Sequence, residues 1–337
     1  MMDLTTTYMG LSLRNPLVAS PSPLSYSLDG VRRLEEGGVG AIVLFSLFEE
    51  QLREQAARAI RLVEESAESF PEALGYFPSV VDEDGSPHAY LTLLESAAAS
   101  VEIPVIASLN GVTPEGWTEY ARAMQDAGAA AIELNIYYLP GGPEISGREV
   151  EQRHVDVLER VRSAVSVPVA VKLSPFFSSA GEMALRLDEA GADALVLFNR
   201  FLQPDIDPEQ LEVLPRVNLS SPADARLACT WIALLRGRVA ASLAATSGVE
   251  VPADIARYLL AGADVVMTTS ALLRHGPEYA AELLDGLRRW MVRKGFGKVD
   301  DLRGLLSVPP ETDAGGYERS AYVHAMRAAN AGAYNPW

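Results

Sequence analysis

A single lysine stands inside an apolar run that has the composition of a short buried strand. The run is Val169-Ala170-Val171-Lys172-Leu173-Ser174-Pro175, and Pro168 precedes it. A buried ammonium group is costly unless an anionic or strongly accepting partner meets it. No carboxylate lies close to Lys172 in the sequence, so its partner is either distant in the chain or a ligand. The alternative is a side chain that extends along the strand end to water.

Polar side chains also end several other apolar runs. They are Ser20, Ser46, Asn110, Asn135 and Asn199. An asparagine amide offers both donors and an acceptor, which suits a planar heterocycle with alternating N–H and C=O groups. An asparagine in such a place can also cap or turn the chain. Because several of them end strands in the way that Lys172 does, the set predicts a site for a flat ring.

Two short segments predict an anion site. They are Ala244-Ala245-Thr246-Ser247-Gly248-Val249 and Thr268-Thr269-Ser270-Ala271. Small residues let backbone N–H groups approach an anion, and a helix N-terminus favours negative charge. Ordinary N-capping by Thr and Ser is the alternative. A phosphate here, a ring across the asparagines and Lys172 at the ring's electron-rich edge together match FMN, whose reduced anionic ring a lysine stabilises.

The elements that must position these residues alternate along the chain. Eight candidate strands are Leu17–Ser20, Ala41–Phe45, Val105–Ser108, Ala131–Ile136, Val169–Leu173, Ala194–Phe198, Val239–Leu243 and Val265–Thr268. Amphipathic segments with apolar residues at three- and four-residue spacing lie between them: Leu28–Glu36, Thr113–Ala127, Gly147–Ala164, Ala180–Ala190, Pro222–Leu235 and Pro252–Leu260. A glycine that can end a helix follows several of these segments. This grammar predicts an α/β fold, and it favours a (β/α)8 TIM barrel over a doubly wound sheet.

The domain organisation follows from the same reading. Residues 1–305 are predicted to form one barrel with a short N-terminal hairpin, and residues 306–337 a tail with one helix at about 317–329. Long connections at 46–90, 137–148 and 199–221 leave strand C-termini, where a barrel builds its active site.

Composition narrows the class of protein. The chain has 337 residues, a net charge of −17 and a single cysteine, Cys229. The negative charge argues against nucleic acid or an anionic membrane as the main partner. One cysteine forms no intrachain disulfide, and the four histidines show no metal-ligand spacing. No signal-peptide pattern or long apolar run is present, so we expect a cytoplasmic protein.

The chain resembles the dihydroorotate dehydrogenase family over residues 4–305. The motifs that carry the resemblance are Asn15-Pro16-Leu17-Val18-Ala19-Ser20, Glu133-Leu134-Asn135, Val171-Lys172-Leu173-Ser174-Pro175, Phe198-Asn199, Leu260-Ala261-Gly262-Ala263-Asp264 and Ser270-Ala271-Leu272-Leu273-Arg274-His275-Gly276-Pro277. The similarity is greatest to bacterial dihydroorotate dehydrogenase-like proteins of the class 1-like FMN type.

The resemblance implies roles for individual residues. Lys172 would contact the flavin ring, and Asn135 and Asn199 would face a substrate pyrimidine. Arg200 departs from the family pattern, which has a small hydroxylic residue there; it suggests a carboxylate or phosphate on the substrate, unless it is an ordinary surface arginine. The residues that would line FMN or hold its phosphate are Ala19, Ser20, Ser46, Asn110, Asn135, Ser247, Gly248, Thr269 and Ser270. It also implies a role in pyrimidine biosynthesis, a homodimer, and an electron acceptor or donor from outside the chain.

Departures from the family pattern concern the substrate chemistry. Where the family has a catalytic cysteine or serine base, this chain has Tyr138 beside Tyr137, and Phe45 replaces a lysine that touches flavin and substrate. Tyrosine, with an ordinary pKa of about 10, is a poor base at neutral pH but a reasonable general acid. Tyr138 or Tyr137 is therefore predicted to donate a proton, or else the pair packs in a lid.

Four functional hypotheses remain. The leading one is an FMN-dependent oxidoreductase that converts dihydroorotate to orotate or catalyses a related CH–CH oxidation or reduction. The second is an FMN-dependent reductase of another unsaturated acid or pyrimidine. The third is a non-catalytic flavin-binding subunit. The fourth is a flavin-free barrel in which Lys172 forms a Schiff base.

Overall fold

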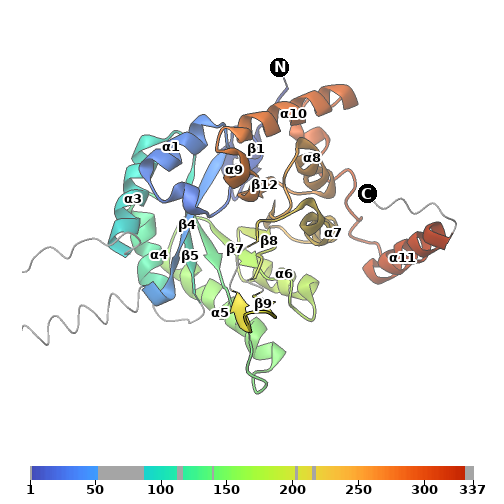
Figure 1. Cartoon of the computed structure of the whole chain (residues 1–337), viewed down its shortest axis with the longest axis horizontal. Helices are drawn as coiled ribbons and strands as arrows, with labels where there is room; N and C mark the ends of the chain where they lie inside the picture. Colours follow the sequence, from blue (N-terminus) through green and yellow to red (C-terminus); the bar gives the residue numbers. More distant parts are fainter. Residues whose placement is uncertain are drawn as a thin grey trace, which may run out of the picture.

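Parallel strands close into a barrel in the part of the chain that the structure covers (Figure 1). The structure is a computed structural model that describes residues 2–51, 87–111, 117–138, 140–201, 204–214 and 218–330. Within these ranges the closed barrel has eight strands: β3 (Leu17–Ala19), β4 (Ala41–Phe48), β5 (Val105–Asn110), β6 (Ala131–Asn135), β7 (Val169–Leu173), β8 (Ala194–Leu197), β11 (Ser242–Ala245) and β12 (Val265–Thr268). The predicted (β/α)8 barrel is confirmed.

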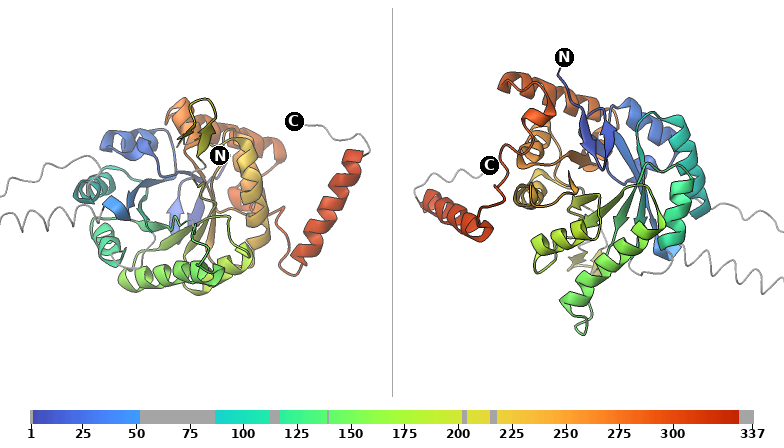
Figure 2. Two further views of the ribbon diagram at one scale, coloured as in Figure 1. Left: turned by 60° about the horizontal axis from the view of Figure 1, so that its bottom comes forward. Right: turned by 180° about the vertical axis from the view of Figure 1, so that it is seen from behind.

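Helices cover the outside of the barrel (Figures 1 and 2). They are α1 (Leu28–Glu36), α3 (Pro87–Ser100), α4 (Trp117–Asp126), α5 (Gly147–Ala164), α6 (Ala180–Glu189), α7 (Ala225–Leu235), α8 (Pro252–Ala261) and α10 (Tyr279–Lys294). Gly128 and Gly191 follow α4 and α6 with φ of 92° and 91°. Glycine takes this backbone conformation without the cost that other residues meet, so the chain can leave each helix and enter the next strand.

The barrel interior is apolar at its N-terminal end and polar near its C-terminal end. Alternate residues of each strand point inward. Val43, Ile106, Ala131 and Ala170 belong to one buried inner cluster. The next inward positions along the strands are polar: Ser108, Asn110, Glu133, Asn135 and Lys172. Along β5, β6 and β7, the inward-facing residues therefore change from apolar to polar toward the C-terminal end.

A short hairpin closes the N-terminal end of the barrel, as predicted. Strands β1 (Thr6–Tyr8) and β2 (Leu11–Leu13) pair antiparallel. Tyr8, Met9 and Leu13 are buried in the inner cluster, and the Met9 N–H donates to Ser242 Oγ at 3.1 Å. The polar end of the interior consequently opens only toward the C-terminal mouth among the described residues.

The C-terminal helix is present and stands apart from the barrel in both orientations of Figure 2. Helix α11 (Ala314–Asn330) starts slightly before the predicted segment. Every residue from Gly315 to Arg327 is exposed. No helix in the described part of the chain is long and apolar enough to cross a membrane.

Several predicted boundaries were wrong. The strand expected at Val239–Leu243 begins at Ser242, because the N–H groups of Ala240 and Ala241 bind the Asp188 carboxylate instead of a neighbouring strand. Strand β4 runs to Phe48, beyond Phe45, by way of a register shift between Val43 and Ser46. Part of the connection at 46–90 and the start of the segment at 113–127 lie outside the described residues.

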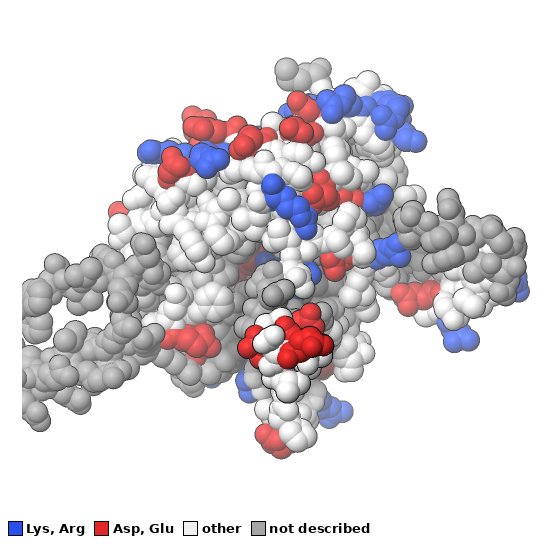
Figure 3. Space-filling model, in the orientation of Figure 1, with Lys and Arg blue, Asp and Glu red and all other residues white. Residues whose placement is uncertain are grey.

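The connection after β8 contains a hairpin that the sequence did not predict. Strands β9 (Asp205–Asp207) and β10 (Glu212–Leu214) pair antiparallel. Acidic side chains gather on this projecting hairpin (Figure 3). Both strands are largely exposed, so their residues carry no core signal that a hydrophobic pattern detects.

Candidate active site

Two adjoining cavities lie at the C-terminal mouth of the barrel. Their volumes are about 570 Å³ and about 170 Å³. Pro21, Lys172, Asn199 and Arg200 line both, so the two spaces meet at these residues. We call them the wide and the narrow cavity. Parallel strands bring their C-terminal residues together here, where barrel enzymes bind their ligands.

The wide cavity has an amide floor and an aromatic wall. Ser46, Asn110, Asn135 and Asn199 supply polar groups on the barrel side. The aromatic residues that line it are Tyr26, Phe45, Phe48, Tyr137 and Phe201. Their rings support one another, with centroids 4.5 Å apart for Tyr26 and Phe45 and 4.3 Å apart for Tyr137 and Phe201. A flat ligand with hydrogen-bonding edges suits this combination.

The narrow cavity suits an anion. Its lining includes the hydroxyl residues Ser20, Ser220, Thr246, Ser247, Thr268, Thr269 and Ser270. Lys172 and Arg200 add positive charge, and no Asp or Glu is among its described lining residues. The Ser20 hydroxyl is buried without a hydrogen-bond partner among the described residues. A lining of hydroxyl groups and cations without a carboxylate favours a phosphate-sized anion.

Lys172 sits where the two cavities meet, and a distant residue neutralises it. Its Nζ lies 3.2 Å from Oε1 of Glu133 on the neighbouring strand β6. Lys172 is 7% exposed and Glu133 is 1% exposed. The register pairs Lys172 with Asn135, so Glu133 lies one inward position deeper in the barrel. The expectation of a partner far away in the sequence is confirmed, and the side chain does not extend to bulk water.

The turn after β11 adopts a left-handed backbone at two consecutive residues. Ser247 has φ of 78° and Gly248 has φ of 70°. A Cβ on Gly248 would lie 2.6 Å from the backbone N of Ala225, so the turn packs directly against the start of α7. A non-glycine residue held at positive φ is uncommon. Ser247 lines the narrow cavity, whereas Gly248 shapes the turn from behind.

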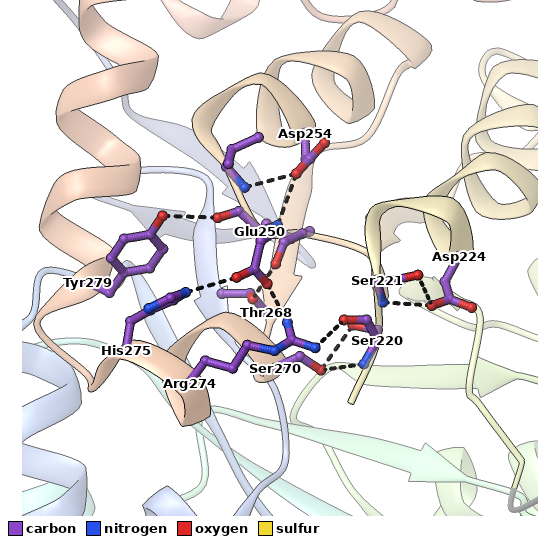
Figure 4. A network of polar contacts seen from close by, with 12 residues as sticks. Ser220, Ser221, Asp224, Glu250, Asp254, Thr268, Ser270, Arg274, His275 and Tyr279 are labelled. Atoms are coloured by element: carbon purple, nitrogen blue, oxygen red, sulfur yellow. Dashed lines mark hydrogen bonds and ion pairs between the residues drawn. The ribbon is translucent and has the colours of Figure 1, made fainter. Parts of the chain in front are cut away.

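A polar network fixes the walls of the narrow cavity (Figure 4). Ser270, the first residue of α9 (Ser270–His275), accepts hydrogen bonds from the N–H and the hydroxyl of Ser220, both at 2.9 Å. Arg274 donates to the Ser220 carbonyl at 2.8 Å and forms an ion pair with Glu250. His275 lies 2.9 Å from the same carboxylate. The connection after β8 and the segments after β11 and β12 are thereby held as one unit.

The predicted substrate residues lie together. Asn199 Nδ2 donates to Asn135 Oδ1 at 2.8 Å, and Ser46 shares a hydrogen bond of 2.8 Å with Ser108. Arg200 donates to the carbonyl of Asn218 at 2.7 Å at the rim. The two amides hold each other's orientation and still present their remaining donors and acceptors to the cavity.

The two candidate tyrosines diverge. Tyr137 lines the wide cavity and packs against Phe201. Tyr138 is not among the described lining residues of either cavity, and the Arg153 guanidinium lies 4.2 Å from its ring centroid. The chain turns directly after β6, where the Tyr137 N–H donates to the Asn135 carbonyl at 2.9 Å and the Tyr138 N–H donates to the Ile136 carbonyl at 3.1 Å.

The other predicted site residues can also be divided into those that line a cavity and those that do not. All of the predicted site residues except Ala19, Gly248 and Tyr138 line one cavity or both. Ala19 is buried in β3 beside the cavity-lining Ser20. The sequence did not assign Glu133 to the site, nor Tyr26, Phe48 and Phe201 of the aromatic wall, whereas Tyr137 was a predicted site residue. The spacing Glu133-x-Asn135 was a usable signal for Glu133, because residues two apart on a strand share a face.

Other reactive groups lie elsewhere. Cys229 is on α7, and burial raises the pKa of its thiol to about 11. Among the described residues no group of three or more His, Cys, Asp or Glu side chains is arranged to hold a metal ion.

Comparison with known proteins assigns the family. A family model described as dihydroorotate dehydrogenase matches residues 3–291. A dihydroorotate dehydrogenase B (NAD(+)) catalytic subunit from Methanothermobacter thermautotrophicus is 28% identical over 321 residues, covering 90% of this chain and 98% of that protein. A putative dihydroorotate dehydrogenase A (fumarate) from Aeropyrum pernix is 27% identical, covering 90% and 97%.

A relative whose name gives a different activity is also similar. The NAD-dependent dihydropyrimidine dehydrogenase subunit PreA of Escherichia coli is 25% identical over 334 residues, covering 92% of this chain and 79% of that protein. The family match extends over most of the chain and includes every strand of the barrel. This chain belongs to the dihydroorotate dehydrogenase family, whose members are oxidoreductases that act on CH–CH groups.

Proposed function

We propose that this protein is an FMN-dependent oxidoreductase of the dihydroorotate dehydrogenase type. The observation that carries the proposal is the position of Lys172 between a hydroxyl-lined anion cavity and an amide-floored aromatic cavity. FMN has a phosphate at one end and a flat ring at the other, joined by a linker. The phosphate would occupy the narrow cavity and the ring the wide cavity. Together the cavities are in the size range of cofactor sites.

The chain offers specific residues to hold FMN. Ser247, Thr269 and Ser270 would bind the phosphate, together with the unpartnered hydroxyl of Ser20. Lys172, Ser46 and Asn110 would meet the ring. When bound, FMN would accept or return two electrons as a hydride equivalent, which no side chain of the site can do.

The other side chains would bind and orient the substrate. Asn135 and Asn199 would hold a planar substrate over the ring through amide groups that already fix each other. Tyr137 would donate a proton to the substrate, because Tyr137 lines the wide cavity whereas Tyr138 does not. The ammonium of Lys172 would stabilise negative charge on the ring. The aromatic wall would exclude water from the reacting atoms.

A second candidate reaction is the reduction of another unsaturated acid or pyrimidine. Phe45 stands in the wall where many family members have a lysine, and Tyr137 offers a proton donor rather than a base. Arg200 at the rim would bind a carboxylate or phosphate of such a substrate. In either reaction the electrons would come from or pass to a partner outside the chain. We further propose a homodimer in the cytoplasm and, if dihydroorotate is the substrate, a role in pyrimidine biosynthesis.

The first experiment is to add L-dihydroorotate anaerobically to the purified protein and follow the flavin absorption bands. Bleaching at a catalytic rate, absent with free FMN alone, would support dihydroorotate as the substrate. A yellow protein that stays oxidised would retain the FMN site and favour the second reaction. A colourless protein that does not bind added FMN would overturn the proposal and leave the flavin-free Schiff-base hypothesis. A yellow protein inert with every unsaturated acid and pyrimidine tested would favour a non-catalytic flavin-binding subunit.

A further inference from the structure

Only one of the two carboxylate oxygens of Glu133 has a polar partner among the described residues. Its Oε1 lies 3.2 Å from Lys172 Nζ, while Oε2 is buried and has no hydrogen-bond partner among the described residues. Glu133 is 1% exposed. An ionised carboxylate in such a place depends on its single cation, since removing one member of a buried pair leaves an uncompensated charge.

Of the polar side chains near Glu133, only Lys172 carries a charge among the described residues. Tyr8 on β1 and Tyr90 on α3 are fully buried beneath the mouth. Burial is the main cause that raises the pKa of both phenols, and the negative charge of Glu133 adds to it. Both phenols therefore stay neutral. Lys172 on β7 is the cation that faces Glu133, and the nearby Ser108 on β5 does not titrate at ordinary pH.

The position of Lys172 couples this carboxylate to the cavities. Lys172 lines both the wide and the narrow cavity and also binds Glu133. A new negative charge in the cavity would compete with Glu133 for the same ammonium. The pair is neutral beforehand, so afterwards the closed interior would carry one excess negative charge unless a proton enters.

We propose that Glu133 is the proton-accepting partner of Lys172, and that it takes up one proton when the ligand above Lys172 becomes negatively charged. The inference rests on the proposed function, in which that ligand is FMN. When bound and reduced, FMN would take up two electrons and one proton, and Lys172 would then face a negative charge in the cavity. One further proton from solvent then neutralises the Glu133 carboxylate, which Lys172 has left. Glu133 is thus a positioning residue that sets the charge of the lysine's surroundings.

The test is the pH dependence of the midpoint potential of the FMN-loaded protein, reduced with dithionite. In a two-electron couple each proton taken up contributes about 30 mV per pH unit, so two protons give about 59 mV. We expect a slope for two protons in the wild type and for one proton in Glu133→Gln. Tyr8→Phe removes a neighbouring buried hydroxyl without touching Lys172, and it should keep the wild-type slope.

Each result decides the inference. Equal slopes for the wild type and Glu133→Gln, with FMN bound to both, would overturn the role of Glu133 and leave the FMN site intact. Failure of the wild type to bind FMN would overturn the proposed function and this inference with it. If Glu133→Gln does not fold, the wild type alone suffices. Its reduced-minus-oxidised infrared spectrum should then gain the C=O band of one protonated carboxylic acid, and absence of that band would overturn the proposal.

Discussion

The narrow and the wide cavity are held in place by different means. Around the narrow cavity, short turns after β11 and β12 are locked by backbone geometry and by the network of Ser220, Ser270 and Arg274. Around the wide cavity, aromatic rings and two amides form the walls; Phe45 and Asn135 come from strands, and Tyr137, Asn199 and Phe201 from the connections that follow strands. The first set depends on backbone shape, and the second depends on exchangeable side chains.

This contrast shows how one barrel can keep a cofactor and change its substrate. Replacing a wall residue such as Phe45 or Tyr137 changes the chemistry of the wide cavity without moving the turns of the narrow one. Function in barrel enzymes resides in the loops at the strand ends rather than in the fold. The departures from the family pattern at Phe45 and Tyr138 belong to this exchangeable half or to the segment that carries it.

The largest effect is expected at Lys172, which joins the two halves. Lys172→Met leaves Glu133 charged and buried without its cation, and it should lower the free energy of unfolding by about 3–5 kcal/mol. Denaturant titration of the protein without FMN measures this. The control is Lys172→Met/Glu133→Gln, which should regain most of the loss because both groups are neutral. A single variant as stable as the wild type would show that the ion pair does not hold this junction.

The next largest effect should separate the two tyrosines. Tyr137→Phe removes the hydroxyl from the wide cavity and should lower turnover by about 10²-fold with the substrate that the anaerobic assay identifies, since loss of a general acid has effects of this size. FMN affinity should not change. Tyr138→Phe is the matched control and should keep turnover near the wild-type value, because Tyr138 packs under Arg153. The opposite order would place the proton donor at Tyr138.

A smaller effect should probe the backbone of the narrow cavity. Gly248→Ala places a Cβ 2.6 Å from the Ala225 backbone N at φ of 70°, so the turn must shift. FMN should bind about tenfold more weakly, a loss of about 1.4 kcal/mol that titration can measure. Gly295→Ala provides the control, because its φ is 82° and its Cβ meets nothing within 4 Å. It should share the backbone strain of about 1–2 kcal/mol and bind FMN normally; equal losses of affinity would contradict a specific role for the turn.

The smallest effect concerns the scaffold behind the wide cavity. His154 on α5 packs against Phe177, and burial lowers the pKa of its imidazole despite a hydrogen bond to the Val150 carbonyl. The unfolded chain then binds more protons as the pH falls through about 6.5, so stability should decrease below that pH by at most about 1.4 kcal/mol per pH unit. Unfolding measured at several pH values should show this slope reduced in His154→Gln. His324→Gln on the exposed helix α11 should leave it unchanged, and parallel curves for all three proteins would exclude His154 as the cause.

Most of the site was predictable because strand ends of a parallel barrel converge. Once the sequence indicated the barrel, Asn135, Lys172 and Asn199 had to meet at one mouth. Two members of the aromatic wall, Tyr26 and Phe201, were not predictable, because they come from connections whose course has no periodic signal. The hairpin of β9 and β10 was missed for the same reason.

The amino-acid sequence by itself determined the alternation of strands and helices, the family resemblance and the polar residues at the mouth. These follow from local periodicity and from residue types that keep their meaning in any context. Only the tertiary structure decided that Glu133 neutralises Lys172, that Tyr137 rather than Tyr138 faces the cavity, and that Gly248 packs against α7. Each of these depends on the direction of a side chain or on an approach between distant segments; the spacing Glu133-x-Asn135 indicates a shared face of one strand, but it does not specify the contact with Lys172 on the next strand.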